Sequence, residues 1–148
     1  MTVVRLPSWG EVLRGPWALR LRSGGTGAWL MRSEADAVPK LECRFLDGRA
    51  ARTTSGALQE LGEAFQLEAP LAAFAELPDA VAGDDTVALL VLDTDRLLVD
   101  EPAALTGLVG ALRDAADRLE LHVIFQARDL TADVEAVLTE FGVAEIAA

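Results

Sequence analysis

The sequence predicts an α/β fold, in which a small, mostly parallel β-sheet is flanked by α-helices. The run 87–92 (VALLVL) is apolar on both faces of a strand, which is typical of a parallel strand buried under helices. Strand-like segments alternate with segments of helical spacing, and the connections are long enough for parallel crossovers. With 148 residues, the chain is the size of one domain with its own core, so we expect a single domain spanning residues 1–148.

The first elements follow from local patterns. Residues 7–14 indicate a short helix, which Ser8 caps and Gly15-Pro16 ends. Residues 17–22 (WALRLR) alternate apolar and basic side chains, which predicts a strand with one buried and one wet face. Further along, the same criteria predict a short helix at residues 28–37, a strand at 41–46 and a tight turn at 47–48.

Helical spacing begins at Thr54, and we expect either Thr54 or Ser55 to cap the helix. Apolar residues on one face of this helix are Leu58, Leu61 and Phe65. A second, more apolar helical segment runs from Leu71 to near Pro78.

The last elements surround the central strand. Asp100-Glu101-Pro102 predicts a helix start, with acids at the positive end of the helix dipole. Helical spacing continues to Leu119, residues 121–125 (LHVIF) predict the last core strand, and Thr131 caps a helix that Gly142 ends.

Charge is unevenly distributed along the chain. Residues 1–52 carry nine basic and five acidic side chains, and residues 53–148 carry four and nineteen, so the balance changes from +4 to −15. An acidic surface repels nucleic acid and favours basic partners, so we expect no direct nucleic-acid binding. A soluble acidic protein whose charge has no specific role is the alternative that stays open.

The expected location is a reducing, cytoplasmic one. Cys43 is the single cysteine and has no partner for an internal disulfide. The N-terminal residues lack the apolar core of a signal peptide, and no apolar run is long enough to cross a bilayer, so we expect no membrane association.

Two carboxylates, Asp93 and Asp95, follow the central strand, where parallel sheets carry their sites. The segment LDTDRLL superficially resembles the DxDxT motif of haloacid dehalogenase-like phosphohydrolases, which implies a Mg²⁺-dependent phosphohydrolase as a weaker alternative. That family needs a downstream Lys, whereas the single Lys of this chain is Lys40. We therefore expect a noncatalytic protein with no cofactor and no metal.

The sole histidine, His122, lies in an apolar strand, which favours a structural role.

A family resemblance rests on the order of several phrases. These are RFLDG at 44–48, ALQELGEAFQL at 57–67, ALLVLDTDRLLVDEPAALTGLVGALRDAADR at 88–118 and HVIFQ at 122–126. Together they resemble the barstar family of intracellular ribonuclease inhibitors, in particular its larger bacterial members with an N-terminal strand and helix. The resemblance implies an N-terminal extension at 1–40, a barstar-like core at 41–126 and a C-terminal helix at 127–148. It also implies a three-stranded parallel core sheet and a face that inserts carboxylates into a basic nuclease active site.

The chain departs from the family in the inhibitory loop. The family loop is rich in Tyr, Gly and Asn, and this chain contains no Tyr and no Asn. In the alignment that the resemblance implies, Ala72 replaces the first inhibitory Asp and Glu76 takes the place of the second. Glu101 lies near another contact acid of the family.

We expect a noncatalytic protein-binding domain, an inhibitor or immunity protein that binds a basic nuclease or toxin through an acidic face. The expected partner-binding residues are Glu68, Leu71, Phe74, Glu76, Asp79 and Glu101. The alternative is a barstar-fold interaction subunit that has lost inhibition and docks another protein or its own copy through the apolar surface around Leu71, Phe74 and Leu77. A homodimer is left open, and for that apolar segment a role in the core is the simpler interpretation.

Overall fold

The computed structural model describes residues 7–145, and its elements are as follows. The strands are β1 (Ala18–Arg22), β2 (Leu41–Asp47), β3 (Thr86–Leu92), β4 (Glu120–Ala127) and β5 (Ala144–Glu145). The α-helices are α1 (Trp9–Arg14), α2 (Gly25–Ala35), α3 (Thr54–Ala64), α4 (Leu77–Val81), α5 (Leu105–Ala115) and α6 (Ala132–Glu140). Short 3₁₀ helices are η1 (Phe74–Glu76), η2 (Thr94–Arg96) and η3 (Pro102–Ala104).

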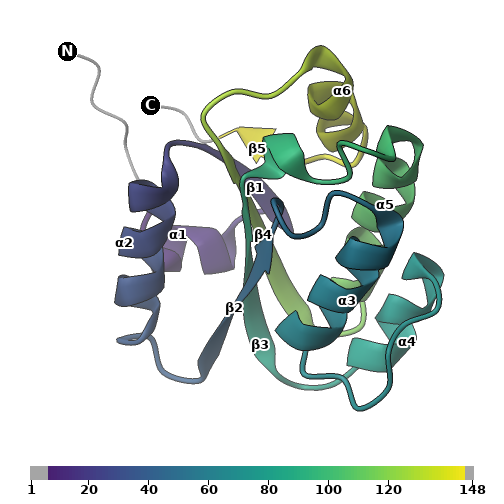
Figure 1. Ribbon diagram of the computed structural model, residues 1–148. Helices are drawn as coiled ribbons and strands as arrows, with labels where there is room; N and C mark the ends of the chain where they lie inside the picture. Colours follow the sequence, from purple (N-terminus) through teal and green to yellow (C-terminus); the bar gives the residue numbers. More distant parts are fainter. Residues whose placement is uncertain (1–6, 146–148) are drawn as a thin grey trace.

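The strands form one sheet in the order β2-β3-β4-β1-β5, and every pairing is parallel (Figure 1). The predicted α/β class, with a parallel sheet flanked by helices, is thereby confirmed. The sheet has a fifth strand, β5, that was not predicted from the sequence, where 121–125 was expected to be the last strand. Within the described residues, no helix combines the length and the apolar character needed to span a membrane.

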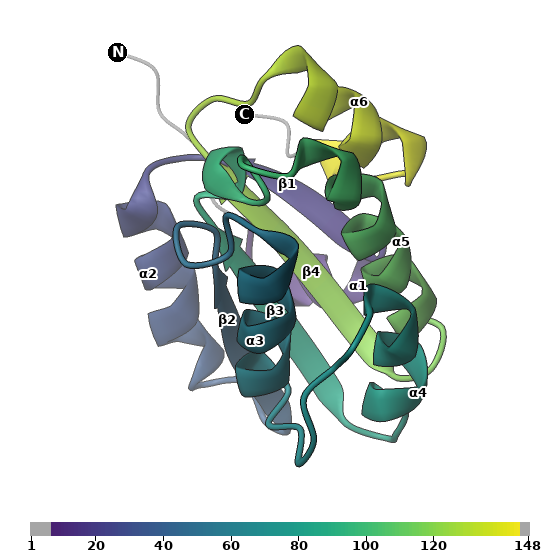
Figure 2. The same ribbon diagram turned by 45° about the vertical axis from the view of Figure 1, so that its right-hand side comes forward.

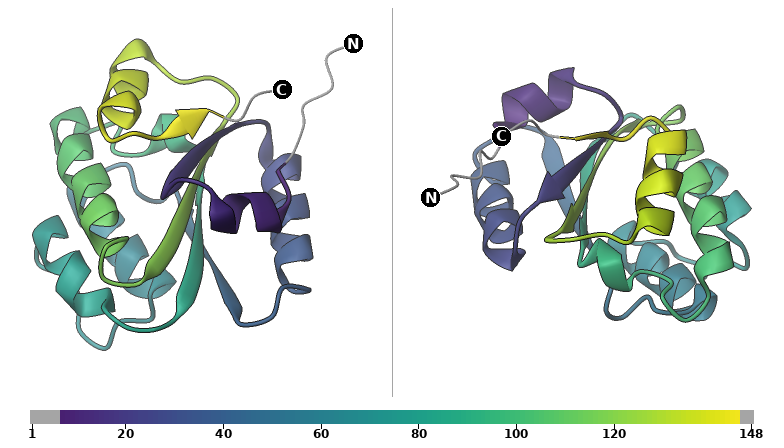
Figure 3. Two further views of the ribbon diagram at one scale, coloured as in Figure 1. Left: turned by 180° about the vertical axis from the view of Figure 1, so that it is seen from behind. Right: turned by 90° about the horizontal axis from the view of Figure 1, so that it is seen from above.

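Helices cover both faces of the sheet (Figure 3). α1 and α2 lie on one face, and α3, α4, α5 and α6 lie on the other (Figures 2 and 3). Each face has its own apolar core, because alternate residues of a strand point to opposite faces. On β4, Val123 and Phe125 enter the larger core and Ile124 enters the smaller one.

The interior position of β1 corrects one prediction. The alternation in residues 17–22 predicted that the face with the basic side chains is exposed to solvent, but Arg20 is only 8% exposed. β1 lies between β4 and β5, and α6 supplies Glu135, whose Oε1 lies 2.7 Å from Nη1 of Arg20. The basic side chain is therefore buried as an ion pair.

Helix starts were predicted less accurately between β2 and β4. The cap of α3 is Thr53, whose hydroxyl accepts from the Gly56 N–H, and not Thr54 or Ser55. The helix expected from Leu71 begins only at η1, and Pro78 lies in the first turn of α4 instead of ending a helix. Proline fits there because first-turn N–H groups have no partner within the helix.

The start of α1 and both ends of α6 were predicted correctly. Ser8 caps α1 by accepting from the Glu11 N–H, and Thr131 caps α6 by accepting from the Val134 N–H. Gly142, with φ of +75°, ends α6 in a Schellman motif.

Candidate functional site

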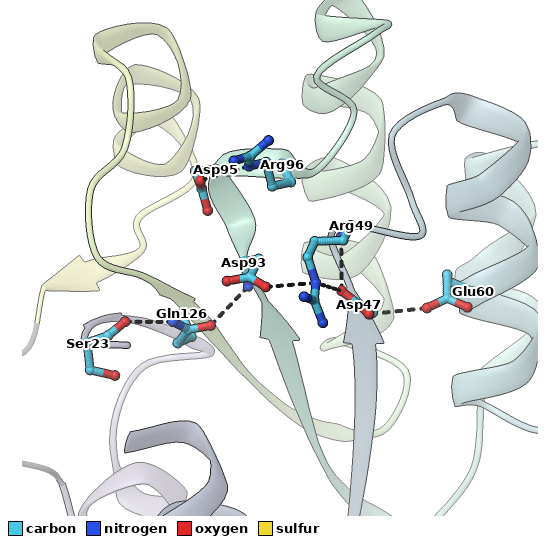
Figure 4. Close-up of polar contacts among 8 residues, drawn as sticks. All are labelled: Ser23, Asp47, Arg49, Glu60, Asp93, Asp95, Arg96 and Gln126. Atoms are coloured by element: carbon cyan, nitrogen blue, oxygen red, sulfur yellow. Dashed lines mark hydrogen bonds and ion pairs between the residues drawn. The ribbon is translucent and has the colours of Figure 1, made fainter. Parts of the chain in front are cut away.

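Asp93 follows β3 at the carboxyl edge of the sheet, where sites of parallel sheets lie. Its backbone is left-handed, with φ of 48°. This conformation aims its N–H at Gln126 Oε1 of β4, at 2.9 Å, and Gln126 Nε2 donates to the Ser23 carbonyl at 2.6 Å (Figure 4). Gln126 is only 1% exposed, so it links the ends of three strands from inside the protein.

The carboxylate of Asp93 is held by an arginine from the neighbouring loop. Arg49 Nε lies 3.2 Å from Asp93 Oδ2 and 3.5 Å from Asp47 Oδ1 (Figure 4). Gly48 lets this loop approach, because a Cβ there would lie 2.2 Å from the Asp93 carbonyl oxygen. We call Ser23, Asp47, Arg49, Asp93 and Gln126 the strand-end network.

Asp95 does not join this network. Its carboxylate lies 3.5 Å from Arg96 Nε on η2, while Asp93 is directed to Arg49 (Figure 4). The two carboxylates of the DxDxT-like segment thus have different arginine partners. Among residues 7–145, no three His, Cys, Asp or Glu side chains form a group that could hold a metal ion.

An open groove of ≈ 890 Å³ lies between α3 and the chain that follows it. It exists because α3 ends in a Schellman motif: Gln66, with φ of 53°, donates to the Glu63 carbonyl, and Leu67 donates to the Gly62 carbonyl. The chain then turns back along the helix to Leu71. The groove is lined by Thr54, Ser55, Leu58, Gln59, Gly62, Glu63, Gln66, Leu67, Glu68, Ala69, Pro70 and Leu71. We call it the acidic groove, for the carboxylates described below.

Several of the predicted partner-binding residues lie around this groove. Glu68 lines it from an exposed position, and Leu71 lines it while packing into the core. Glu101 marks one end, since its carboxylate accepts from the Thr54 N–H at 3.0 Å and from the Thr54 hydroxyl at 3.3 Å. The predicted helix start is correct, since Glu101 is the N-cap residue of η3, but its side chain binds the first residue of α3 and not its own helix.

Like Glu101, the other three predicted residues do not line the groove. Glu76 Oε1 accepts from the Ala72 N–H at 3.1 Å, which braces the loop beyond Leu71. Phe74 is half-buried against the core, and Asp79 forms an ion pair with Arg118 at 3.3 Å. Leu77 is fully buried, so the structure favours the core interpretation for this part of the apolar segment.

The groove lies in a segment of one charge sign. Residues 53–95 contain nine acidic residues and no Lys, Arg or His. On the groove, Glu63 and Glu68 are exposed, and within residues 7–145 neither forms an ion pair. Burial raises the pKa of nearby Glu60, and the adjacent Glu63 raises it further, while the Asp47 N–H that Glu60 binds lowers it.

Sequence reasoning missed the helical wall of the groove. Ser55, Gln59 and Gly62 are spaced by three or four residues, which places them on one stripe of α3. That stripe could have been found from the spacing. Its partner wall could not, because the left-handed conformation of Gln66 is unusual for glutamine.

His122 and Cys43, the sole histidine and the sole cysteine of the chain, are both largely enclosed. His122 is buried in β4, and its nearest charged neighbour is Glu120, at 3.5 Å from Nε2. Cys43 is a free thiol on β2, and burial raises its pKa to about 11, partly offset by Arg32. Neither lies on the acidic groove.

The acidic groove combines an apolar floor with carboxylates at its rim, an arrangement suited to basic protein surfaces that carry apolar side chains. The strand-end network, by contrast, pairs its carboxylates internally. Comparison of the chain with models of known families, with curated proteins and with solved structures found no match.

Proposed function

We propose that the chain is a noncatalytic protein-binding domain, a barstar-like inhibitor or immunity protein that binds a basic nuclease or toxin. The observation that carries the proposal is the acidic groove, where exposed Glu63 and Glu68, which form no ion pair within residues 7–145, lie beside an apolar floor. Carboxylates without internal cations are free to accept charge-assisted hydrogen bonds from a partner's Arg and Lys. The resemblance to the barstar family supports the same kind of partner.

The departure at Ala72 sets the expected specificity. Ala72 is exposed and its N–H is bound by Glu76, so the position at which the family carries an inhibitory Asp offers no charge here. We therefore propose that the acids of the groove, and not position 72, contribute most of the charge recognised by the partner. An interaction subunit that binds without inhibiting is the second candidate, and the missing Asp favours it.

The experiment titrates the chain against a barnase-type ribonuclease and against any basic nuclease that a neighbouring gene encodes. Binding is measured by calorimetry and inhibition by cleavage of a fluorogenic RNA. Glu63→Gln and Glu68→Gln should together weaken binding by about tenfold or more, because each removes a charge-assisted contact. Asp114→Asn plus Glu140→Gln is the matched control, since both of those acids are exposed and lie on α5 and α6.

The outcomes separate the two candidates. Binding with inhibition supports an inhibitor, and binding without inhibition supports the interaction subunit. Affinity that falls equally in the groove pair and in the control pair would show a general charge effect and would count against the acidic groove. If the chain binds neither nuclease, the proposed function is wrong.

A further inference from the structure

β2 is the terminal strand of the sheet and pairs with β3 on one side only. At its carboxyl end, the Gly48 N–H points to β3, where it donates to the Leu92 carbonyl at 2.7 Å. The Asp47 N–H points the other way and donates to Glu60 Oε1 at 3.1 Å. Because strand residues alternate, the N–H and C=O groups of Cys43 and Phe45 also point away from β3, toward the open edge.

Apolar side chains lie next to this edge. Phe45 is 38% exposed and Trp29 of α2 is 65% exposed. Both line a pocket of ≈ 330 Å³ at the carboxyl end of β2. An edge strand with outward backbone groups and exposed aromatic residues is a template for pairing with another strand.

We propose that β2 pairs antiparallel with β2 of a second copy of this chain, around a two-fold axis at Cys43. The charges of the strand are self-complementary in this arrangement. Glu42 and Arg44 form an ion pair within one chain, at 2.8 Å. Across the axis, Glu42 of each copy lies opposite Arg44 of the other, which makes the interface isologous.

The charges select this register over its neighbours. In any register that keeps the outward N–H and C=O groups of both strands hydrogen-bonded, the numbers of two opposite residues add up to the same sum as here or to one that differs by a multiple of two. In the neighbouring register on one side, Arg44 lies opposite Arg44 of the other copy. In the neighbouring register on the other side, Glu42 lies opposite Glu42 of the other copy. Like charges directly opposite each other are destabilising. In the favoured register, Phe45 lies opposite Leu41, so the apolar face of the strand also matches.

The register makes a geometric prediction about the single cysteine. Cys43 faces Cys43 as a hydrogen-bonded antiparallel pair, for which the Cα atoms are about 5.5 Å apart. This separation lies within the range that a disulfide spans. The thiol therefore serves as a probe of the register.

The test is sedimentation equilibrium of the full chain, with Glu42→Arg, Arg44→Glu and the double reversal as variants. The wild type should dimerise, each single reversal should weaken dimerisation by about tenfold or more, and the double reversal should restore it. Asp114→Arg on α5 is the control for a change of net charge, and circular dichroism checks that each variant is folded. Oxidation of the wild type with copper phenanthroline should give a covalent dimer, and Cys43→Ser should not.

A wild type that stays monomeric overturns the proposal, including the case in which it binds an extended peptide instead. A dimer that both single reversals leave unchanged also overturns it. The proposal does not rest on the proposed function. Glu63 lines the acidic groove and also a hollow beside β2 that Cys43, Arg44 and Phe45 line. The variants were therefore chosen at Glu42 and Arg44, which do not line the acidic groove; Arg44 touches it only through Gln66.

Discussion

The strand-end network and the acidic groove both carry acidic residues, but the acids have different surroundings. At the strand ends, Arg49 lies between Asp47 and Asp93, and buried Gln126 fixes the backbone beneath them. On the groove, Glu63 and Glu68 face solvent. The acids at the carboxyl edge of the sheet are thus paired with an arginine, whereas the acids on α3 and the loop after it are exposed and form no ion pair within residues 7–145. Substitutions should therefore cost stability in the first region and binding in the second.

Gly48→Ala should have the largest effect. A Cβ at this position would lie 2.2 Å from the Asp93 carbonyl oxygen and 2.6 Å from that of Leu92. Both are backbone atoms, so β3 and its turn must move, at a cost of about 3 kcal/mol or more. Urea unfolding at constant m value measures the loss.

Gly62→Ala on the groove wall is the matched control. No atom lies within 4 Å of a Cβ built there, and alanine favours the interior of a helix by about 0.5–1 kcal/mol over glycine. Equal losses in the two variants would contradict the contrast between the regions.

Gln126→Met should have the next largest effect. The substitution keeps the size of the side chain but leaves the Asp93 N–H and the Ser23 carbonyl without their partners. An unsatisfied buried polar group costs about 1–3 kcal/mol. The same change at exposed Gln59 should stay within about 0.5 kcal/mol, and thermal unfolding of both variants gives the comparison. A harmless Gln126→Met would mean that the link between the strand ends contributes little.

Gln66→Gly tests the turn that forms the groove. Gln66 and Gly142 hold the same position in two Schellman motifs, with φ of 53° and 75°. Glycine adopts this conformation without steric cost. Gln66→Gly should therefore stabilise the fold by up to about 1 kcal/mol, and Gly142→Ala should destabilise it by a similar amount. The gain at Gln66 is reduced by loss of its contact with Arg44 Nη2, at 3.3 Å. Chemical unfolding of both variants measures this, and changes of equal sign would be inconsistent with it.

The sequence was sufficient for the parts of the fold that depend on local pattern and burial. The apolar run 87–92 became the buried strand β3, and the caps at Ser8 and Thr131 were correct, because each depends on residues close in the chain. Arg20 was misplaced on a wet face because the covering residue, Glu135, comes from a helix over a hundred positions away.

The candidate site was predicted in part for the same reason. Glu68 and Leu71 were found because they flank the loop where the barstar resemblance places recognition. Glu101 starts its own helix as predicted, but the contact of its carboxylate with Thr54, 47 residues away in the chain, was not predicted. The groove itself depends on left-handed Gln66, and no local preference of glutamine indicates that conformation.

The smallest predicted effect is a dependence on pH at Glu60, beside the strand-end network. Burial, reinforced by Glu63, raises its pKa above the ordinary value of 4.5, so the folded protein holds this proton more tightly than the unfolded chain. The resulting stabilisation is full below pH 4.5 and is lost as the pH rises through the folded-state pKa. Glu60→Gln keeps an oxygen acceptor for the Asp47 N–H and removes the titration. The variant should therefore gain stability relative to wild type over that window.

The pKa shift of Asp100 has the opposite sign, because Arg52 lowers the pKa of this carboxyl below 3.8. Asp100→Asn should be less stable than wild type at neutral pH, and the difference should vanish as the pH falls through the folded-state pKa. Urea unfolding at a series of pH values gives both curves. Parallel curves for the two variants would show that neither carboxyl titrates differently in the folded protein.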